Sequence, residues 1–321
     1  MLALLLAASV SLPVIIDTDC GSDDLMAISY LLARREIKIE AITIANGLAH
    51  VGKGAENILR LLAYAGRGDV PVYVGREKPL AGDAQFPKPW RETADNLPGV
   101  QLPAAKARVQ KETAAAFLRK RLKDTKHPIA VLAIGPLTNF GEALEKNSAA
   151  LKTIEDFVIM GGAVRAQGNL GVGGDFKTDN ITAEWNFYID PLAAERVFNS
   201  ELPIRLVPLD ATMRVPITGQ FLTEFLALKK TGLGELVSQV LESQKSSIDQ
   251  GFYQAWDPLA AVALVDKRVL ITDGLTVRIK LNKPEQGRSQ TSPGLKKNAD
   301  VAIGARALMF KDLFFEAFTQ K

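Results

Sequence analysis

The feature that most constrains this chain is a cluster of four aspartates directly behind a short apolar run. Residues 14–16 are Val-Ile-Ile, a run that is too short for a helix and whose β-branched residues are typical of a buried strand. The next eight positions hold four acidic residues, Asp17, Asp19, Asp23 and Asp24. We therefore expect a strand whose end and following turn carry four carboxylates close together.

A turn and a helix are expected directly after this strand. Gly21 permits a sharp turn, and Ser22 or Asp23 can cap the helix that follows. Apolar residues then recur at helical spacing and form one core-facing stripe, made of Leu25, Ile28 and Leu32.

Four like charges at the end of one strand repel one another, and an ordinary solvated loop would not gather them. A hard cation with oxygen ligands relieves this repulsion, and Ca²⁺ or Mg²⁺ suits such a site. Acids that cap an exposed helix would explain Asp23 and Asp24 but would leave Asp17 and Asp19 unexplained. The sequence therefore predicts a metal site.

Two other uses of such a pattern imply different functions. An EF-hand loop that began at Asp17 would need its bidentate glutamate at the position of Ile28, so this interpretation fails. A strand that ends in Asp-x-Asp also occurs in phosphatases with an aspartate nucleophile, in which the second aspartate acts as acid. This stretch alone does not decide between a metal site and a phosphatase.

The rest of the chain excludes several classes of function. Its 321 residues, 47% of them hydrophobic, suit one large α/β domain or two small ones with an ample core. A net charge of +3 is too small to indicate binding to nucleic acid or to a membrane surface. Cys20 is the only cysteine, which excludes a disulfide framework, and His50 and His127 lack the spacing of a zinc site.

The N-terminus, residues 1–12, is a separate apolar segment. It is shorter than the ~20 residues of a membrane-spanning helix and resembles the hydrophobic core of a secretory signal, with small residues at 7–11, although a basic start is missing. We expect it to be a signal-peptide remnant, or else an apolar extension that packs on the domain. Residues 13–321 would then form a single domain that works in the periplasm or outside the cell, with a cytoplasmic location as the alternative.

From residue 37 onward, strand and helix patterns alternate. Strands are expected at 37–44, 71–74, 129–134, 157–160, 204–207 and 275–279. Helices are expected around 55–62, over 112–122, mostly over 229–248, from 256 and over 306–318. Strand–helix–strand units at this spacing are parallel and right-handed, and ligands bind beyond the carboxyl ends of such strands, which is where the aspartates lie.

Three further segments bear on function. Residues 75–103 are rich in Pro and Gly and are expected to be irregular, with Trp90 in the middle. The glycine-rich segment 168–175 lacks the strand and helix of a dinucleotide site and has no P-loop lysine, so it does not predict phosphate binding. A helix is expected to start near Trp256 with Asp257 as its cap.

With these motifs in order, the chain resembles a nucleoside hydrolase of the inosine–uridine-preferring superfamily. The resemblance rests on DTDCGSDD at 17–24, IGPLTN at 134–139, VIMGGAV at 158–164, GN at 168–169, TAEWNFYIDP at 182–191 and AWDP at 255–258. FPKPWR at 86–91 and AWDP also resemble the purine-specific (inosine–adenosine–guanosine) branch. The resemblance implies a mostly parallel, Rossmann-like open sheet flanked by helices, and a homodimer or homotetramer.

The resemblance also implies a Ca²⁺ site and a mechanism of hydrolysis. Asp19, Asp24, Asp257 and the backbone carbonyl of Ile134 would bind the ion, with Asp17 just outside them. Asp19 would also take the proton from the water that attacks the anomeric carbon. A nearby carboxylate base suits this chemistry, because Ca²⁺ lowers the pKa of water only modestly.

The nucleoside would be held by polar and aromatic residues. Asp23 and Asn186 would bind ribose hydroxyls, and Asn169 and Glu184 would bind the 5′-hydroxyl end. Two tryptophans, Trp90 and Trp256, would enclose the base. Stacking between indoles favours a cationic ring and would help a purine to gain a proton as it leaves, so purine nucleosides are the expected substrates.

The sequence departs from the family pattern at three positions. Cys20 stands where relatives usually have proline, Leu48 where they often have Asn or Asp, and Trp256 where the inosine–uridine branch has a histidine acid. Ser22 and the AEWN segment fit a phosphatase badly. The alternatives that stay open are a hydrolase of broad specificity and a calcium-dependent nucleoside- or sugar-binding protein without activity.

Overall fold

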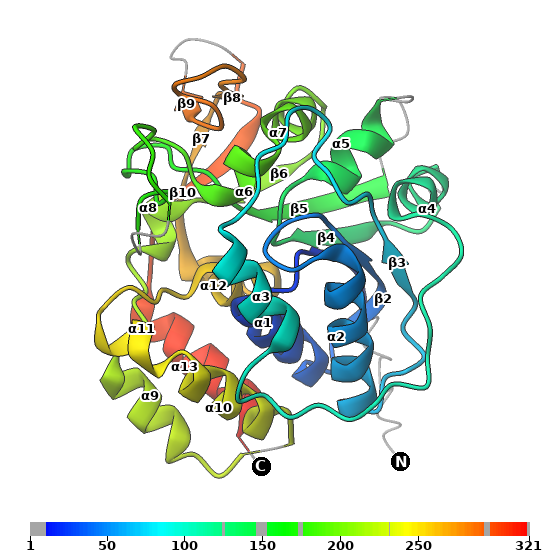
Figure 1. Ribbon diagram of the computed structural model, residues 1–321, viewed down its shortest axis with the longest axis vertical. Coiled ribbons are helices and arrows are strands. Elements are labelled where there is room, and N and C mark those ends of the chain that lie inside the picture. Colours follow the sequence, from blue (N-terminus) through cyan, green and yellow to red (C-terminus); the bar gives the residue numbers. More distant parts are fainter. Residues whose placement is uncertain are drawn as a thin grey trace, which may run out of the picture.

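In the computed structural model, residues 11–123, 126–145, 153–172, 176–230, 232–291 and 296–319 are described. The expected signal segment therefore lies almost wholly outside the described residues. At the centre is a sheet of eight strands in the order β3-β2-β1-β4-β5-β6-β10-β7 (Figure 1). These strands are β1 (Leu12–Thr18), β2 (Ile37–Ile44), β3 (Val72–Val74), β4 (Ile129–Ala133), β5 (Ile154–Met160), β6 (Ile204–Val207), β7 (Leu270–Leu275) and β10 (Ala299–Ala305).

The pairing of the strands confirms the predicted fold class. Every pair from β3 to β10 is parallel, and only β7 runs antiparallel, beside β10. The expected strands at 37–44 and 204–207 coincide with β2 and β6. A separate small sheet pairs β8 (Val277–Ile279) with β9 (Ser289–Thr291).

Helices cover both faces of the sheet (Figure 1). One face carries α1 (Ser22–Ala33), α2 (Val51–Tyr64), α9 (Gly219–Leu226), α10 (Gly232–Ser243), α12 (Trp256–Val265) and α13 (Ala307–Phe318). The other face carries α4 (Ala114–Arg121), α5 (Thr138–Leu144) and α7 (Pro191–Phe198). Shorter helices are α6 (Trp185–Ile189), α8 (Leu209–Thr212) and α11 (Lys245–Asp249).

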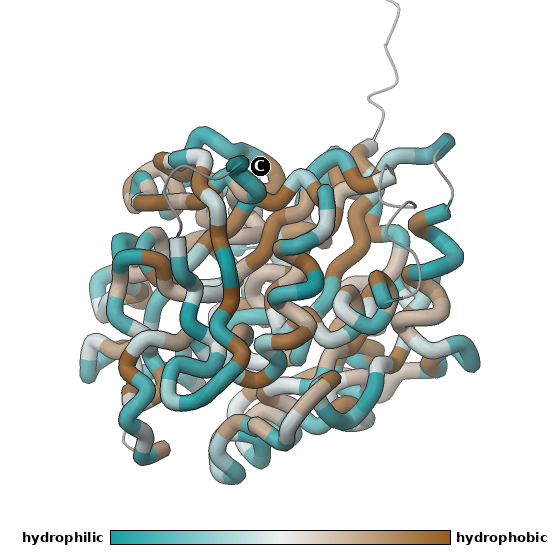
Figure 2. The backbone as a smooth tube through the Cα atoms, turned by 90° about the horizontal axis from the view of Figure 1, so that it is seen from above, coloured by the Kyte–Doolittle hydropathy of each residue, from teal (hydrophilic) through white to brown (hydrophobic). Residues whose placement is uncertain are grey.

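The two hydrophobic cores meet at β1, which is buried on both sides. Val14 and Ile16 belong to the core under α1 and α12, and Ile15 belongs to the opposite core. Strands of parallel sheets are commonly buried on both faces and therefore read as continuous apolar runs. Figure 2 shows apolar segments in the interior and hydrophilic segments mainly in the outer loops. No helix among the described residues is long and apolar enough to cross a membrane.

The structure corrects the prediction that residues 75–103 are irregular. They contain α3 (Lys88–Asn96), whose N-cap is Pro87 and whose first turn includes Pro89. Proline suits the first turn of a helix because the N–H groups there have no partner within the helix. The prolines that indicated a loop therefore start a helix, and Trp90 lies in its first turn.

Two expected elements are divided, and two strands, β9 and β10, were not predicted. The helix expected over 229–248 is α10 followed by α11, and the strand expected over 275–279 is the end of β7 followed by β8 in another sheet. β10 was not predicted, although it lies between β6 and β7. Its sequence, ADVAIGA, offers few bulky β-branched residues as a signal.

Candidate active site

The turn after β1 is built differently from the prediction. The residue in the left-handed conformation is Cys20, with a φ of 65°, whereas Gly21 is extended and forms the N-cap of α1. The expected caps, Ser22 and Asp23, lie inside the helix. Gly21 is needed for space, because a Cβ there would lie 2.9 Å from Asp23 Oδ1 and 2.9 Å from Leu48 Cδ2.

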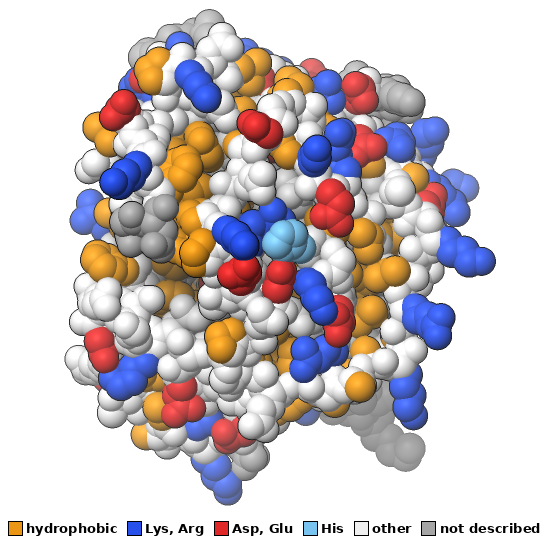
Figure 3. Space-filling model, viewed as in Figure 1, with side chains coloured by type: hydrophobic (Ala, Val, Ile, Leu, Met, Phe, Trp, Pro, Cys, Tyr) orange, Lys and Arg blue, Asp and Glu red, His pale blue; other side chains and the backbone are white. Residues whose placement is uncertain are grey.

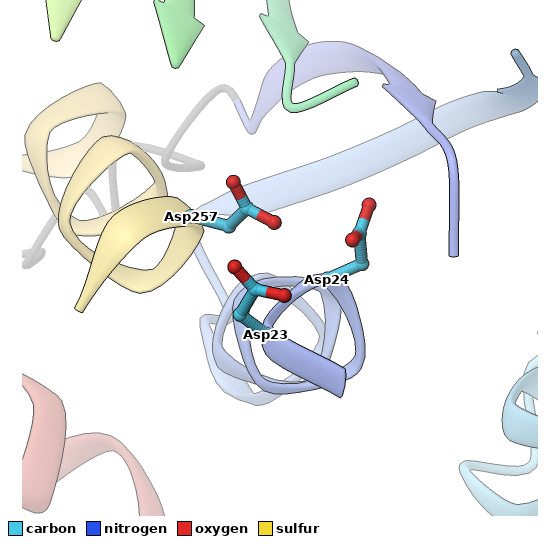
Figure 4. Close-up of side chains that lie close together, drawn as sticks. All are labelled: Asp23, Asp24 and Asp257. Atoms are coloured by element: carbon cyan, nitrogen blue, oxygen red, sulfur yellow. The ribbon is translucent and has the colours of Figure 1, made fainter. Parts of the chain in front are cut away.

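Three carboxylates converge just beyond this turn. Asp23 and Asp24 extend from the start of α1 and Asp257 from the start of α12 (Figure 4), and one oxygen of each lies within 4.8 Å of the others. Asp257 occupies the first turn of α12 and is not its cap, since the N-cap is Ala255. The packing of α1 against α12 therefore assembles the cluster from two distant parts of the sequence.

Burial and mutual repulsion raise the pKa values of these carboxyl groups. Burial raises the pKa of Asp24 to about 7, with repulsion from Asp23 added. The pKa of Asp257 is raised well above its usual value by burial and then by Asp23 and Asp24. A hydrogen bond from Gly21 N–H to Asp24 Oδ2, at 2.8 Å, and one from the Thr18 hydroxyl to the other oxygen orient the Asp24 carboxylate.

This donor set fits a hard divalent cation. Every candidate ligand atom is an oxygen, and a cation would replace the repulsion with attraction. The end of β4 also adjoins the site: Ile134 N–H donates to the Asp17 carbonyl at 2.8 Å, and a Cβ on Gly135 would lie 2.9 Å from Asp19 Cβ. The expected use of the Ile134 carbonyl as a ligand stays a prediction.

Asp19 lies next to the three converging carboxylates and is only 4% exposed. Its Oδ2 accepts a hydrogen bond from Leu48 N–H at 2.7 Å. Burial, followed by repulsion from Asp24, raises its pKa well above the usual range. A carboxyl with a high proton affinity beside a cation site is suited to act as a general base.

Asp17 lies two residues before Asp19 and is fully buried. Its Oδ1 accepts hydrogen bonds from Thr43 Oγ1 at 2.5 Å and from Asn139 Nδ2 at 2.7 Å. Its Oδ2 has no hydrogen-bond partner among the described residues, and burial raises its pKa to about 7. Asp17 therefore connects β1, β2 and α5 at the edge of the sheet that carries the site.

Three polar residues from the sequence prediction gather near the end of β5 and the start of α6. Glu184 caps α6 by accepting a hydrogen bond from Asn186 N–H at 2.9 Å, and its Oε2 also accepts one from Gly162 N–H, just after β5, at 2.8 Å. Burial raises its pKa to about 7, and its charge contributes to the raised pKa of Asp19. The Asn169 side chain accepts a bond from Trp185 N–H at 3.2 Å, and Asn186 donates to the Met160 carbonyl at 3.2 Å.

The three tryptophans divide between two aromatic groups. Trp90 is half-buried on α3, and its ring centroid lies 5.6 Å from that of Trp185. Trp185 is 5% exposed and stacks on Phe86, so it is an aromatic residue of the core. Trp256 packs edge-on against Tyr253. Leu48 packs against the cluster that contains Trp185 and also against the large core on which Trp256 packs. The enclosure of a base by Trp90 and Trp256 stays a prediction.

Hydrophobic side chains gather on the molecular face beside α3 (Figure 3). The small cluster of Phe86, Leu170, Ala183, Trp185 and Ile189 has Trp90 and Leu48 packed against it. The five members of this cluster are buried, whereas Trp90 and Leu48 are half-buried, so these two side chains carry its apolar character toward the surface.

Sequence reasoning missed two side chains that the structure places at the site. The Thr18 hydroxyl contacts Asp24, as described above. Tyr253 is 5% exposed and its hydroxyl lies 3.0 Å from Ser22 Oγ; burial, followed by repulsion from Asp23, raises its pKa well above the usual value. The sequence offers no sign that Tyr253 would meet Ser22, because this contact depends on how α1 and α12 pack.

Comparisons with known proteins agree on one family. The family model described as "Inosine-uridine preferring nucleoside hydrolase" matches residues 14–312. The chain is 33% identical over 324 residues to the pyrimidine-specific ribonucleoside hydrolase RihA of Citrobacter koseri. That comparison covers 95% of this chain and 97% of the relative.

Solved structures share the fold over nearly the whole chain. The plant nucleoside hydrolase PpNRh1 matches with a TM-score of 0.83 at 26% identity, over 96% of this chain and 99% of its own. A purine-preferring ribonucleoside hydrolase from Gardnerella vaginalis matches with a TM-score of 0.81 at 26% identity, over 95% and 97%. By their names, the similar proteins thus include both pyrimidine-specific and purine-preferring enzymes.

Proposed function

Because the chain belongs to the inosine–uridine preferring nucleoside hydrolase family, we propose that it hydrolyses the N-glycosidic bond of ribonucleosides, with Ca²⁺ as its metal and purine nucleosides as preferred substrates. The observation that carries the proposal is the convergence of Asp23, Asp24 and Asp257 beside the buried Asp19. This arrangement supplies oxygen ligands and a carboxylate base at one edge of the sheet.

The residues that would hold the ion are Asp19, Asp24, Asp257 and the Ile134 carbonyl. When bound, Ca²⁺ supplies positive charge that keeps these carboxylates ionised and lowers the pKa of a nearby water. Asp19 accepts a proton from the attacking water, while the hydrogen bond from Leu48 N–H holds its Oδ2 in place. The bond to the base breaks through an oxocarbenium-like state, which the surrounding negative charge stabilises.

Polar side chains orient the sugar. Asp23, next to the ligands, and Asn186, beyond β5, would bind ribose hydroxyls, and Asn169 and Glu184 would bind the 5′ end. The backbone hydrogen bonds of Glu184 fix its direction before substrate arrives, which lowers the cost of orientation.

The purine preference rests on the aromatic residues. Trp256 immediately precedes Asp257, so its indole starts from the first turn of the same helix, and Trp90 lies in the apolar cluster on α3. Stacking on indoles stabilises a protonated purine by about 1–2 kcal/mol per face. A pyrimidine preference is the second candidate, because the sequence relative from Citrobacter koseri is named pyrimidine-specific.

The test is the release of reducing sugar from inosine, adenosine, guanosine, uridine and cytidine. We expect the purine nucleosides to be hydrolysed fastest, activity to disappear in excess EDTA, and added Ca²⁺ to restore it. Faster hydrolysis of uridine and cytidine would establish the second candidate. Calcium binding without release of sugar from any nucleoside would favour a binding protein instead. Where aspartates of the site are replaced, as in Asp19→Asn and Asp24→Ala, the control variant is Asp69→Asn, which changes an exposed acid after α2.

The proposal extends to assembly and physiology. The chain would work as a homodimer or homotetramer and would scavenge nucleosides outside the cytoplasm for salvage. Light scattering of the purified protein tests the assembly, and a monomer at assay concentration would contradict it.

A further inference from the structure

Two side chains of α3 hold opposite sides of one peptide group in the loop between β2 and α2. Arg91 Nη2 donates to the Ala49 carbonyl oxygen at 3.4 Å. Asp95 Oδ1 accepts a hydrogen bond from His50 N–H at 2.8 Å, and its Oδ2 lies 2.7 Å from His50 Nδ1. The Ala49–His50 peptide group is thus hydrogen-bonded to α3 on both sides, through Arg91 at its carbonyl oxygen and through Asp95 at its N–H.

Asn57 of α2 completes this joint. Its Nδ2 donates to the carbonyl oxygens of Ala94 and Asp95, at 3.2 Å and 3.0 Å. Carbonyls in the last turn of a helix have no partner within the helix, and Asn57, which is 2% exposed, satisfies two of them. The carboxyl end of α3 is therefore tied to both α2 and the loop before it (Figure 1).

The loop that α3 holds is also hydrogen-bonded to Asp19. Leu48 N–H donates to Asp19 Oδ2 at 2.7 Å, and Ala49 N–H donates to the Asp19 backbone carbonyl at 3.0 Å. Successive N–H groups of residues 48–50 therefore bind Asp19 on one side and Asp95 on the other. A Cβ on Gly47 would lie 2.1 Å from Asp19 Oδ2, so the loop has little room to shift without moving that carboxylate.

The other end of α3 carries Trp90, next to Arg91. Arg91 is 7% exposed, and a buried charge is costly unless it is hydrogen-bonded or paired; its guanidinium donates to Gln85 Oε1 and to the Ala49 carbonyl oxygen. Burial lowers the pKa of Arg91, while Asp95, Glu77 and Asp19 act against this change. The cation is therefore stabilised by the charges of both carboxylates that contact the loop.

We propose that Asp95 is a positioning residue that sets the base-contacting Trp90 and the catalytic Asp19 relative to each other through the loop at 48–50. The inference rests on the proposed function of these two residues. Asp95 acts through the Ala49–His50 peptide and the His50 ring, and it has no direct part in the reaction. The contacts between α3 and the loop at 48–50 then determine both where the nucleobase stacks and where the attacking water loses its proton.

Hydrogen exchange tests the joint without any assay of activity. In Asp95→Ala, the amides of Leu48 and Ala49 should exchange about tenfold faster, because the loop loses its outer anchor. Asp95→Asn retains an acceptor for His50 N–H and should show a smaller effect. The matched control is Glu92→Ala, which removes an exposed acid of the same helix whose ion pair with Lys88 is local; exchange at 48–49 should stay unchanged there.

Kinetics then test what the joint does for catalysis, on whichever nucleoside the wild type hydrolyses. In Asp95→Ala, kcat should fall about tenfold on that nucleoside and on p-nitrophenyl riboside alike. Both reactions need the Asp19 carboxylate to accept the proton of the attacking water, and a misplaced Asp19 slows both. KM for the nucleoside should rise, and this rise should vanish when Trp90→Ala is already present.

The outcomes separate this inference from the proposed function. Exchange and kinetics of Asp95→Ala that match those of Glu92→Ala would overturn the positioning role. So would a KM effect that persists without Trp90. If the wild type releases no ribose from any nucleoside, the proposed function fails, whereas unchanged exchange at residues 48–49 would refute the joint itself.

Discussion

Cys20 adopts a left-handed backbone conformation between Asp19 and Gly21, with a φ of 65°. Its N–H donates to Thr18 Oγ1 at 3.1 Å, and its side chain lies against α2, where a Cβ on Gly54 would come 2.8 Å from its sulfur. The thiol is buried, and burial raises its pKa well above the usual value. Cys20 is thus a packed turn residue and not a nucleophile.

Cys20→Pro should therefore be harmful. Proline fixes φ near about −65° and has no N–H, so the turn would have to refold and displace Asp19. We expect the free energy of unfolding to fall by more than about 1 kcal/mol and turnover to be lost. Cys20→Ala keeps the backbone N–H and should retain turnover. Thermal melting and activity assays check this, and a Cys20→Pro protein with wild-type melting and turnover would refute this account of the turn.

At the scale of elements, α12 and α3 would determine how the leaving base is activated. Trp256→Ala, at the start of α12, should lower kcat on inosine by about five- to thirtyfold, which corresponds to the loss of about 1–2 kcal/mol of stacking on one face. Hydrolysis of p-nitrophenyl riboside should hardly change, because its leaving group needs no proton. Equal losses on both substrates, measured by steady-state kinetics, would contradict this role for the indole.

The elements also show how far the sequence could predict the fold. β4 is a continuous apolar run, and β1 and β5 each contain one; parallel strands buried on both faces produce that pattern. α3 was missed because Pro87 and Pro89 also suit a loop, and only packing against α2 selects the helix. β10 was missed because small residues and an aspartate break up its pattern.

The candidate site was predictable to a similar degree. Motif order identified Asp19, Asp24 and Asp257 as candidate ligands, since each lies next to a recognisable strand or helix. It could not predict that Asp23, and not Asp19, completes the close cluster with Asp24 and Asp257, or that Tyr253 meets Ser22, because these contacts depend on the packing of α1 on α12. The joint of Asp95 with His50 likewise depends on a helix that the sequence did not reveal.

At the scale of the whole molecule, the acidic cluster should make stability depend on calcium and pH together. In the calcium-free protein, burial raises the pKa of Asp17 and Asp24 to about 7 and that of Asp23 to about 6. Unfolded aspartates titrate near about 3.9, so between these values the folded state binds more protons and its free energy of unfolding falls as pH rises.

We therefore expect the melting temperature in EDTA to be lower at about pH 7.5 than at about pH 5. Calcium should reverse this trend, because it binds the ionised carboxylates and its affinity grows as they lose protons. Differential scanning calorimetry at both pH values, with EDTA and with Ca²⁺, measures the effect. A calcium-induced gain in melting temperature that is larger at the lower pH would contradict the account of the cluster.

The location of the protein depends on its N-terminus. If residues 1–12 contain the core of an export signal, the mature chain begins shortly before β1, because β1 starts at Leu12 and must remain intact. N-terminal sequencing of the protein from its native host should find a start near residue 12. An intact Met1 in the cytosolic fraction would rule out export.

The central claim is that one acidic cluster binds Ca²⁺ and that Asp19 beside it is the base. The most direct measurement determines calcium stoichiometry by titration calorimetry and ribose release on the same samples of three proteins. The wild type should bind calcium and release ribose, Asp24→Ala should lose both, and Asp19→Asn should keep much of its calcium binding while losing turnover. Turnover in Asp19→Asn close to that of the wild type, or full activity in Asp24→Ala without bound metal, would contradict the claim.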